Sequence, residues 1–435
     1  MNRFVSTMGR VILMSMMCVA VLQAASCAKP SATQVAEGMV DSMAKGDFAS
    51  ATKDFDATMK AVMPAEKLGQ FWVQLTAQHG AFKSRTGSRE AQEAGFQTLH
   101  VTCQFEKAVL DTKVVFNKDG KIGGLWINLI QLAEVPYKLP SYVHKERFKE
   151  YPVLINKGGE WELPGTLTAP EGKGPFPAVV LVHGSGPADR DETIGPNKPF
   201  KDIAWGLASR GIVVLRYDKR SKIYTDPAMW DKNYTVKEEV TDDALAAVKM
   251  LHGPARIDPK RIFVLGHSNG GLLSPRIGKA DPKIAGLIMM AGCVTQPLKD
   301  VLLRQLTYVA SLNGPITDDT KKEIDKQLQL LMKAAPASYI QDLGDYIRSA
   351  PEMAKSLRQP MLVIQGARDY QTTEADFNIW KDVLSSRTNV MFKLYPDLNH
   401  VFMTGVGMAT PEEYEKPGSV AQTVIDDIAL WINMH

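Results

Sequence analysis

The sequence predicts an α/β protein in which a mostly parallel sheet is covered by helices on both faces, preceded by a small α+β domain. From about residue 150 onward, continuous apolar runs of strand length alternate with helical stretches, which is typical of buried parallel strands. Before about residue 130, helical periodicity gives way to alternating apolar and polar residues, which indicates an antiparallel sheet. No period of about 20 to 50 residues repeats, so a solenoid is not expected.

The first 27 residues are typical of an export signal. Arg3 and Arg10 precede an apolar run at 11–25, which is shorter than the roughly 20 residues that span a membrane. Cys27 ends a stretch that resembles a bacterial lipoprotein box, although Ala24 stands where leucine is usual. We expect a periplasmic, extracellular or membrane-anchored protein. Simple secretion and a lipid anchor at Cys27 both stay open, and that anchor is the only membrane contact expected.

The composition allows two domains and gives no electrostatic case for nucleic acid as a partner. The chain has 435 residues, of which 45% are hydrophobic and 23% charged, as in ordinary globular proteins. Two of its 51 basic residues, Arg3 and Arg10, lie in the export signal, which leaves 49 basic against 48 acidic residues. A net charge near zero does not attract nucleic acid or a membrane surface.

The cysteines indicate neither a disulfide framework nor a metal site. Cys18 and Cys27 lie in or beside the export signal, while Cys103 and Cys293 fall in different candidate domains. We expect both of the latter to be buried as small apolar residues. No clustered Cys/His spacing is present, so no metal or other cofactor is expected.

Residues 29–130 are predicted to form a separate α+β domain. Helical spacing and then strand alternation follow one another along residues 35–43, 48–62, 99–105 and 110–116. An Asp119-Gly120 turn leads into a further strand at 121–127. This order favours a cystatin-like or NTF2-like fold with a stabilising or docking role. Residues 131–149 are expected to act as a linker.

The remaining residues, 150–435, carry the alternating strands and helices. Antiparallel edge strands are expected at 160–167, followed by apolar strands at 178–182, 212–215, 262–265, 285–290, 361–364 and 390–394. Helices are expected between and after them, at 199–209, 236–251, 272–279, 374–384 and 419–434. A helical stretch at 294–358 interrupts this alternation at the strand ends where active sites form. We interpret it as a helical cap that shapes the substrate pocket.

A nucleophile turn is the most informative motif. Gly266-His267-Ser268-Asn269-Gly270 follows an apolar strand and precedes a helix, which is the arrangement that holds a nucleophilic serine on a tight turn. The small residues two before and two after Ser268 avoid a clash between closely approaching backbones.

Three further segments supply the partners that such a serine needs. The turn His183-Gly184-Ser185-Gly186 follows a buried strand and can aim N–H groups at an oxyanion. Asp369 follows another buried strand, and His400 lies in a loop before the last helix. We predict Ser268 as nucleophile, His400 as base and Asp369 as the orienting acid, with Asp397 as its competitor. The predicted oxyanion donors are the backbone N–H groups of Asn269 and Ser185. His183 and His267 are interpreted as packing or hydrogen-bonding residues of the two turns.

With the order Ser, Asp, His, these motifs resemble those of the α/β-hydrolases. The resemblance is to secreted bacterial serine esterases of the dienelactone-hydrolase and prolyl-oligopeptidase-like branch, some of which carry a small N-terminal domain. It covers roughly residues 150–435 and is most specific at 183–192, 215–220 and 266–271. It implies the α/β-hydrolase fold. Dienelactone hydrolases use cysteine as nucleophile, so Ser268 argues against the dienelactone reaction.

The function expected is that of a secreted serine carboxylesterase acting on a small-molecule or polymer-linked ester without a cofactor. Two alternatives stay open. One is a serine aminopeptidase or prolyl-oligopeptidase-like peptidase, which would share the triad. The other is a non-catalytic envelope binding protein that acts through its N-terminal domain. Asp189, Arg190 and Asp191 are expected to form a structural ion-pair loop near the catalytic site and not to act chemically.

Overall fold

The computed structural model describes residues 30–93, 95–132, 137–225, 234–295, 297–333 and 335–435. The expected export signal and Cys27 lie outside these residues. The chain divides into two compact units, Met1–Glu134 and Val135–His435. Among the described residues, no helix combines the length and the apolarity needed to cross a membrane.

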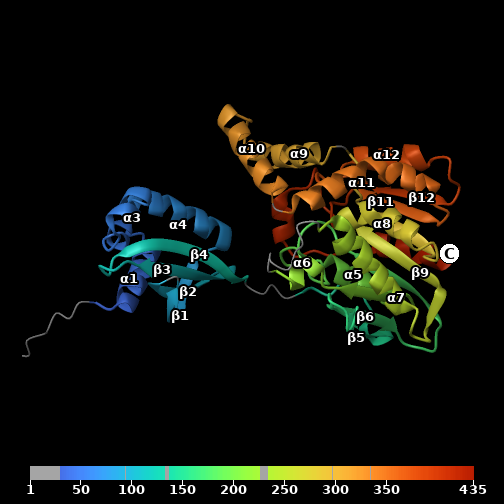
Figure 1. Ribbon diagram of the computed structural model, residues 1–435, viewed down its shortest axis with the longest axis horizontal. Coiled ribbons are helices and arrows are strands. Elements are labelled where there is room, and N and C mark those ends of the chain that lie inside the picture. Colours follow the sequence, from blue (N-terminus) through green and yellow to red (C-terminus); the bar gives the residue numbers. More distant parts are fainter. Residues whose placement is uncertain (1–29, 94, 133–136, 226–233, 296, 334) are drawn as a thin grey trace, which may run out of the picture. The chain divides into compact units, whose positions relative to one another are not determined.

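The first unit is an antiparallel sheet preceded by helices (Figure 1). Its helices are α1 (Ala32–Ala44), α2 (Phe48–Ala51), α3 (Ala57–Val62) and α4 (Ala65–His79). Its strands pair in sequence order: β1 (Phe82–Glu93), β2 (Phe96–Phe105), β3 (Ala108–Phe116) and β4 (Ile122–Leu132). The small α+β unit predicted from the alternating apolar pattern is therefore confirmed.

Two parts of this unit differ from the sequence prediction. The helical stretch expected at 48–62 is broken into α2 and α3, because Asp56 lies between them and accepts a hydrogen bond from the N–H of Met59 at 2.8 Å. Strand β1 has no counterpart in the prediction, because its residues are mostly polar and exposed and show no alternation. Its register is instead set by pairing with β2.

The core of the first unit includes Cys103, whose thiol is buried among apolar residues of the helices and the sheet. Cys293, in the second unit, is only partly buried. The expectation of two buried cysteines is therefore right for Cys103 and wrong for Cys293, which faces a cavity described below. Both are free thiols.

The second unit is built on a sheet with the strand order β12-β11-β10-β9-β7-β8-β6-β5. The strands from β12 to β8 run parallel, and β6 and β5 pair antiparallel at one edge. The strands are β5 (Phe148–Ile155), β6 (Leu163–Pro170), β7 (Phe176–Val182), β8 (Val213–Tyr217), β9 (Ile257–His267), β10 (Gly286–Met290), β11 (Met361–Gly366) and β12 (Val390–Tyr395). This confirms the predicted mostly parallel sheet.

Helices cover both faces of this sheet (Figure 1). One face packs against α5 (Pro199–Ala208) and α13 (Gln422–Met434). The other packs against α7 (Asp243–Leu251), α8 (Asn269–Ala280), α11 (Ala337–Ser356) and α12 (Glu374–Leu384). Successive residues of β7 alternate between the two cores, because side chains of a strand point to opposite faces. The residues that the structure describes also contain the short helical turns α6 (Arg220–Ile223), a π-helical turn (Lys237–Asp242) and 3₁₀ turns at Lys145–Arg147 and Pro411–Glu415.

The segment 294–358 contains α9 (Leu298–Ser311), α10 (Asp318–Met332) and α11. Helix α10 reaches away from the sheet, whereas α11 lies along it (Figure 1). Only the last of these three helices therefore contributes substantially to the central core.

The segment expected as a linker, 131–149, is largely part of the two units. Strand β4 continues to Leu132, and β5 already begins at Phe148. Between them, Tyr142 is buried against the α5 and α13 side of the sheet, and its hydroxyl donates to the carbonyl of Val420 at 2.8 Å. Aromatic burial thus attaches this stretch to the second unit.

Candidate active site

Ser268 lies on a strained turn between β9 and α8. Its backbone has φ 53° and ψ −115°, a conformation that costs about 1–3 kcal/mol and is common at functional sites. Its N–H donates to the carbonyl of Met290 at 2.8 Å, which ties the turn to β10. A Cβ on Gly266 would lie 2.1 Å from the carbonyl oxygen of Gly270, so only glycine fits there. Gly270 is equally confined, because its Cβ would lie 2.2 Å from the carbonyl oxygen of Val182.

His400 and Asp369 form a buried pair. The imidazole Nδ1 of His400 lies 2.6 Å from Oδ2 of Asp369. The other carboxylate oxygen, Oδ1, accepts the N–H groups of Gln371 at 2.7 Å and Thr372 at 3.0 Å. Asp369 is 1% exposed, so these contacts fix its orientation. Asp397 is exposed, and in the described structure the carboxylate on His400 is that of Asp369.

One cavity of about 500 Å³ is lined by a subset of the predicted residues, namely Gly184, Ser185, His267, Ser268, Asn269 and His400. A Cβ on Gly184 would lie 3.1 Å from the Cβ of Ser268, so the two glycine turns touch. Asn269 opens α8, and the first N–H groups of a helix have no intrahelical acceptor. The cavity therefore joins a serine, an imidazole and unpaired backbone donors.

Gly186 and His183 do not line this cavity. His183 is buried beneath the first turn, where its Nε2 lies 3.0 Å from the carbonyl oxygen of Asp189. Its ring packs against Phe200 and Tyr217, with ring centroids 5.0 and 5.3 Å away. This matches the interpretation of His183 as a packing residue.

His267 connects the nucleophile turn to the histidine loop. Its Nε2 donates to the carbonyl of His400 at 2.9 Å, and its Nδ1 forms an ion pair with Oε2 of Glu192, also at 2.9 Å. Burial alone would raise the pKa of Glu192, but the charge of His267 outweighs it and holds that pKa below its usual value. Conversely, burial lowers the pKa of His267, but Glu192 raises it above its usual value.

Sequence reasoning missed Glu192, Lys219 and Glu239 as parts of the site. All three are charged and at most 6% exposed. Buried charges require partners, but the partner of Glu192 lies 75 positions later in the chain. Glu192 and Lys219 had one signal, membership of the segments 183–192 and 215–220 that carried the family resemblance, whereas Glu239 lies outside both segments.

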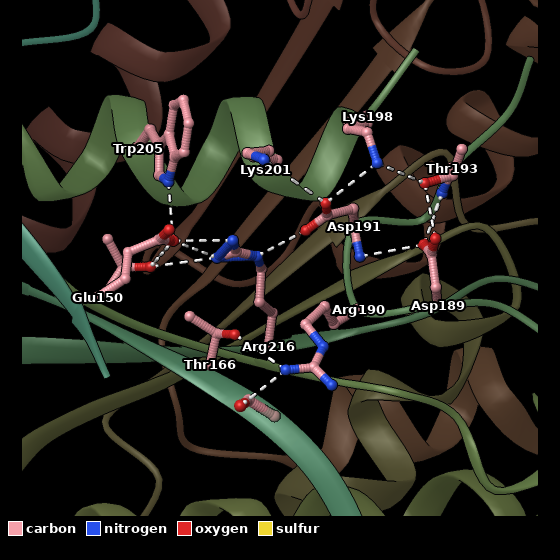
Figure 2. A network of polar contacts seen from close by, with 12 residues as sticks. Glu150, Thr166, Asp189, Arg190, Asp191, Thr193, Lys198, Lys201, Trp205 and Arg216 are labelled. Atoms are coloured by element: carbon pink, nitrogen blue, oxygen red, sulfur yellow. Dashed lines mark hydrogen bonds and ion pairs between the residues drawn. The ribbon is translucent and has the colours of Figure 1, made fainter. Parts of the chain in front are cut away.

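A polar network fixes the loop that follows the first turn (Figure 2). The guanidinium of Arg216 binds Asp191 at 3.0 Å and Glu150 at 2.8 Å. Arg190 forms an ion pair with Asp218, as expected for a structural loop. Asp189 differs from the expectation, because its carboxylate accepts from the hydroxyl and the N–H of Thr193 and from the N–H of Asp191 instead of pairing with a cation.

His183 should make stability depend on pH. Burial lowers the pKa of His183 from 6.5 to about 4. At a pH between these two values, the imidazole is therefore protonated in the unfolded chain but neutral in the folded protein. The stability contributed by the neutral imidazole is complete above pH 6.5 and is lost as the pH falls toward 4. At about 1.36 kcal/mol for each pKa unit, the loss amounts to about 3 kcal/mol.

The measurement is the free energy of unfolding by urea at pH 7 and pH 4.5. Between pH 7 and pH 4.5, the free energy of unfolding should fall much less in the variant His183→Asn than in the wild type, whatever the absolute stability of the variant. His252→Gln is the matched control, because His252 is exposed at the end of α7. An unchanged pH dependence in His183→Asn would contradict the prediction.

The second unit matches a known family of hydrolases. Residues 175–405 match the family model described as serine aminopeptidase, S33. The chain belongs to this α/β-hydrolase family. Residues 36–125 match a model described as a protein of unknown function, DUF3887. The predicted resemblance to α/β-hydrolases, and with it the predicted fold, is confirmed.

Relatives of this α/β-hydrolase include named esterases. Esterase EstD of Thermotoga maritima is 41% identical over 403 residues, which cover 90% of this chain and 93% of that esterase. Among solved structures, the Pyrococcus furiosus esterase Pf2001 is 20% identical, with 62% of this chain and 90% of that chain covered and a TM-score of 0.43. Dienelactone hydrolase from Anabaena variabilis is 15% identical, with coverages of 66% and 99% and a TM-score of 0.41.

Proposed function

We propose that this α/β-hydrolase is a serine carboxylesterase in which Ser268 forms an acyl-enzyme. One observation carries the proposal: the strained Ser268 turn shares a cavity with His400, whose Nδ1 is bound to a buried carboxylate. A serine hydroxyl is a weak nucleophile at neutral pH and needs such a base. The 41% identity to an esterase over most of both chains supports the same reaction class.

The reaction would proceed in two steps. Because Nδ1 of His400 donates to Asp369, Nε2 is the nitrogen free to take the proton of Ser268 as its oxygen attacks the ester carbonyl. The N–H groups of Asn269 and Ser185 would stabilise the tetrahedral oxyanion. His400 then protonates the departing alcohol. Water, deprotonated by the same imidazole, attacks the acyl-enzyme, and the carboxylic acid leaves as Ser268 regains its proton.

The cavity favours esters with an apolar group of moderate size. Its wall includes aliphatic residues from α8, α9 and α11, namely Leu272, Leu298, Val301, Leu302, Leu343 and Ile347. At about 500 Å³ it lies toward the lower end of the roughly 300–1,000 Å³ typical of ligand pockets. The helical segment 294–358 supplies five of these six side chains, which supports its role as a cap that shapes the pocket.

A peptidase is the second candidate, because the family model carries an aminopeptidase description. An aminopeptidase needs a free carboxylate to bind the substrate's amino terminus. The acidic residues described in the cavity wall are Asp189 and Glu192. Asp189 is occupied by Thr193, and Glu192 by His267 and the N–H of Gly184. Since neither carboxylate is free, the cavity favours an ester over the substrate of an aminopeptidase.

The deciding experiment compares p-nitrophenyl esters of increasing acyl length with aminoacyl-p-nitroanilides. We expect ester hydrolysis, greatest for short to medium unbranched acyl groups, and little anilide cleavage. Fluorophosphonate labelling followed by mass spectrometry should place a single adduct on Ser268. Anilide cleavage without ester turnover would establish the peptidase. An absence of any adduct would favour the third candidate, a binding protein that acts through the unit containing α1–α4 and β1–β4.

We also propose that the enzyme is exported, either secreted or held by a lipid at Cys27. Residues 1–27 are the basis of this proposal. The mass of the protein recovered from its own cells would decide it: cleavage near residue 27 without added mass means secretion, and added acyl chains mean an anchor.

A further inference from the structure

Two buried side chains form hydrogen bonds with the backbone of the turn that would supply the second oxyanion donor. The ammonium of Lys219 donates to the carbonyl of Gly184 at 2.9 Å and to the carbonyl of Gly186 at 3.0 Å. In addition, Oε1 of Glu192 accepts the N–H of Gly184 at 2.8 Å. Three backbone polar groups of one short turn are therefore held by side chains, and none of these is paired with another strand.

These hydrogen bonds determine the direction in which the N–H of Ser185 points. The carbonyl of Gly184 and the N–H of Ser185 belong to one peptide unit, and in a trans peptide they point in opposite directions. Since the carbonyl points at buried Lys219, the N–H of Ser185 points away from it. Ser185 is exposed and lines the cavity next to Gly184, which touches Ser268.

We infer that Lys219 is a positioning residue for hydrolysis: by holding the carbonyls of Gly184 and Gly186, it aims the N–H of Ser185 at the oxygen of the reacting carbonyl. This inference rests on the proposed function, because it assigns a task within acyl transfer. Lys219 itself touches neither substrate nor Ser268. It acts from beneath the turn, just after the end of β8.

The choice of a lysine supports this task. Lys219 is 2% exposed, and a buried ammonium costs several kcal/mol unless each of its protons is bound. An ammonium has three protons, and three acceptors surround this one: the two carbonyls and Oε2 of Glu239 at 3.4 Å. Glu239 is held in turn by the hydroxyl of Tyr339 in α11 at 2.7 Å. An apolar residue would fill this space at lower cost, but it could not bind the two carbonyls.

The test is the double variant Lys219→Met/Glu239→Gln. It removes the two opposite charges together, so neither is left buried without its partner. With a p-nitrophenyl ester that the wild type hydrolyses, we expect kcat to fall by about 10²–10³-fold, the usual effect of losing one oxyanion donor. KM should stay within a few-fold. A trifluoromethyl ketone, which forms a tetrahedral adduct with serine, should bind more weakly by a similar factor.

The control is Lys237→Met. Lys237 lies two residues before Glu239, is exposed, and forms an ion pair with Asp242. Thermal unfolding monitored by circular dichroism establishes that each variant is folded. A folded double variant with the wild-type kcat, or one with a change in KM alone, would overturn the inference.

Failure of the proposed function has a different signature. If the wild type hydrolyses no ester but is labelled by fluorophosphonate, the rate of labelling replaces kcat, because the phosphoryl oxygen uses the same donors. A slower rate in the double variant then supports the role of Lys219, and an equal rate overturns it. If the wild type is not labelled at all, both proposals fall.

Discussion

Ester hydrolysis by the Ser268→Ala variant is expected to be slower than that of the wild type by about 10⁶-fold in kcat, and His400→Ala should lose about as much. The reason is that the two side chains act as one unit. Without the imidazole, the hydroxyl of Ser268 stays protonated, and without the hydroxyl the imidazole has no proton to take.

The diagnostic result is the double variant Ser268→Ala/His400→Ala, which should be no slower than either single variant. If the decrease in kcat of the double variant equalled the product of the two single decreases, the two residues would act independently. That result would contradict an acyl-enzyme on Ser268. The measurement is kcat for one p-nitrophenyl ester across the three variants. Ser356→Ala serves as the control, because Ser356 lies exposed at the end of α11 and only caps a helix carbonyl.

The strained turn at Ser268 could be read from the sequence because its causes are local. A strand, a glycine on each side of the serine and a following helix are all contained within residues 257–280. The same holds for Asp369, which could be placed at the end of β11 because an apolar run precedes it. Chain order together with a loop position then selected His400 from the eight histidines, since His435 also follows Asp369 but is the last residue.

The supporting charges could not be placed in this way. Glu192 has φ 50°, a conformation that a non-glycine residue rarely adopts. The neighbouring residues in the sequence do not predict this conformation. Its partner His267 is distant in sequence, and Lys219 meets Gly184 only because β8 pairs with β7. Which buried charges pair is a property of the assembled sheet, and a single sequence does not contain it.

The same limit applies to strand β1 of the first unit. Its residues are polar on both faces, so the period of two that identifies a half-buried strand is absent. The strand exists because β2 offers it an edge, with pairing from Phe82 opposite Phe105 to Glu93 opposite Phe96. Tertiary pairing, and not local preference, determines this element.

The acid of the triad offers the second large effect: Asp369→Asn should lower kcat by about 10⁴-fold while leaving the fold intact. The two carboxylate oxygens have different partners. Oδ1 accepts two backbone N–H groups, at 2.7 and 3.0 Å, so the amide oxygen of asparagine must take that place. The amide NH₂ then occupies the place of Oδ2, facing Nδ1 of His400 and the Nε2 of Gln365, which donates to Oδ2 at 3.1 Å and would lose that acceptor.

An NH₂ group can only donate, so Nδ1 must become the acceptor and the imidazole proton moves to Nε2. That nitrogen then carries a hydrogen where it should receive the proton of Ser268, so the base is disabled. Asp397→Asn is the matched control, because Asp397 is exposed three residues before His400 and should tolerate the change. The reverse result, with Asp369→Asn near wild-type activity and Asp397→Asn inactive, would transfer the role of the acid to Asp397.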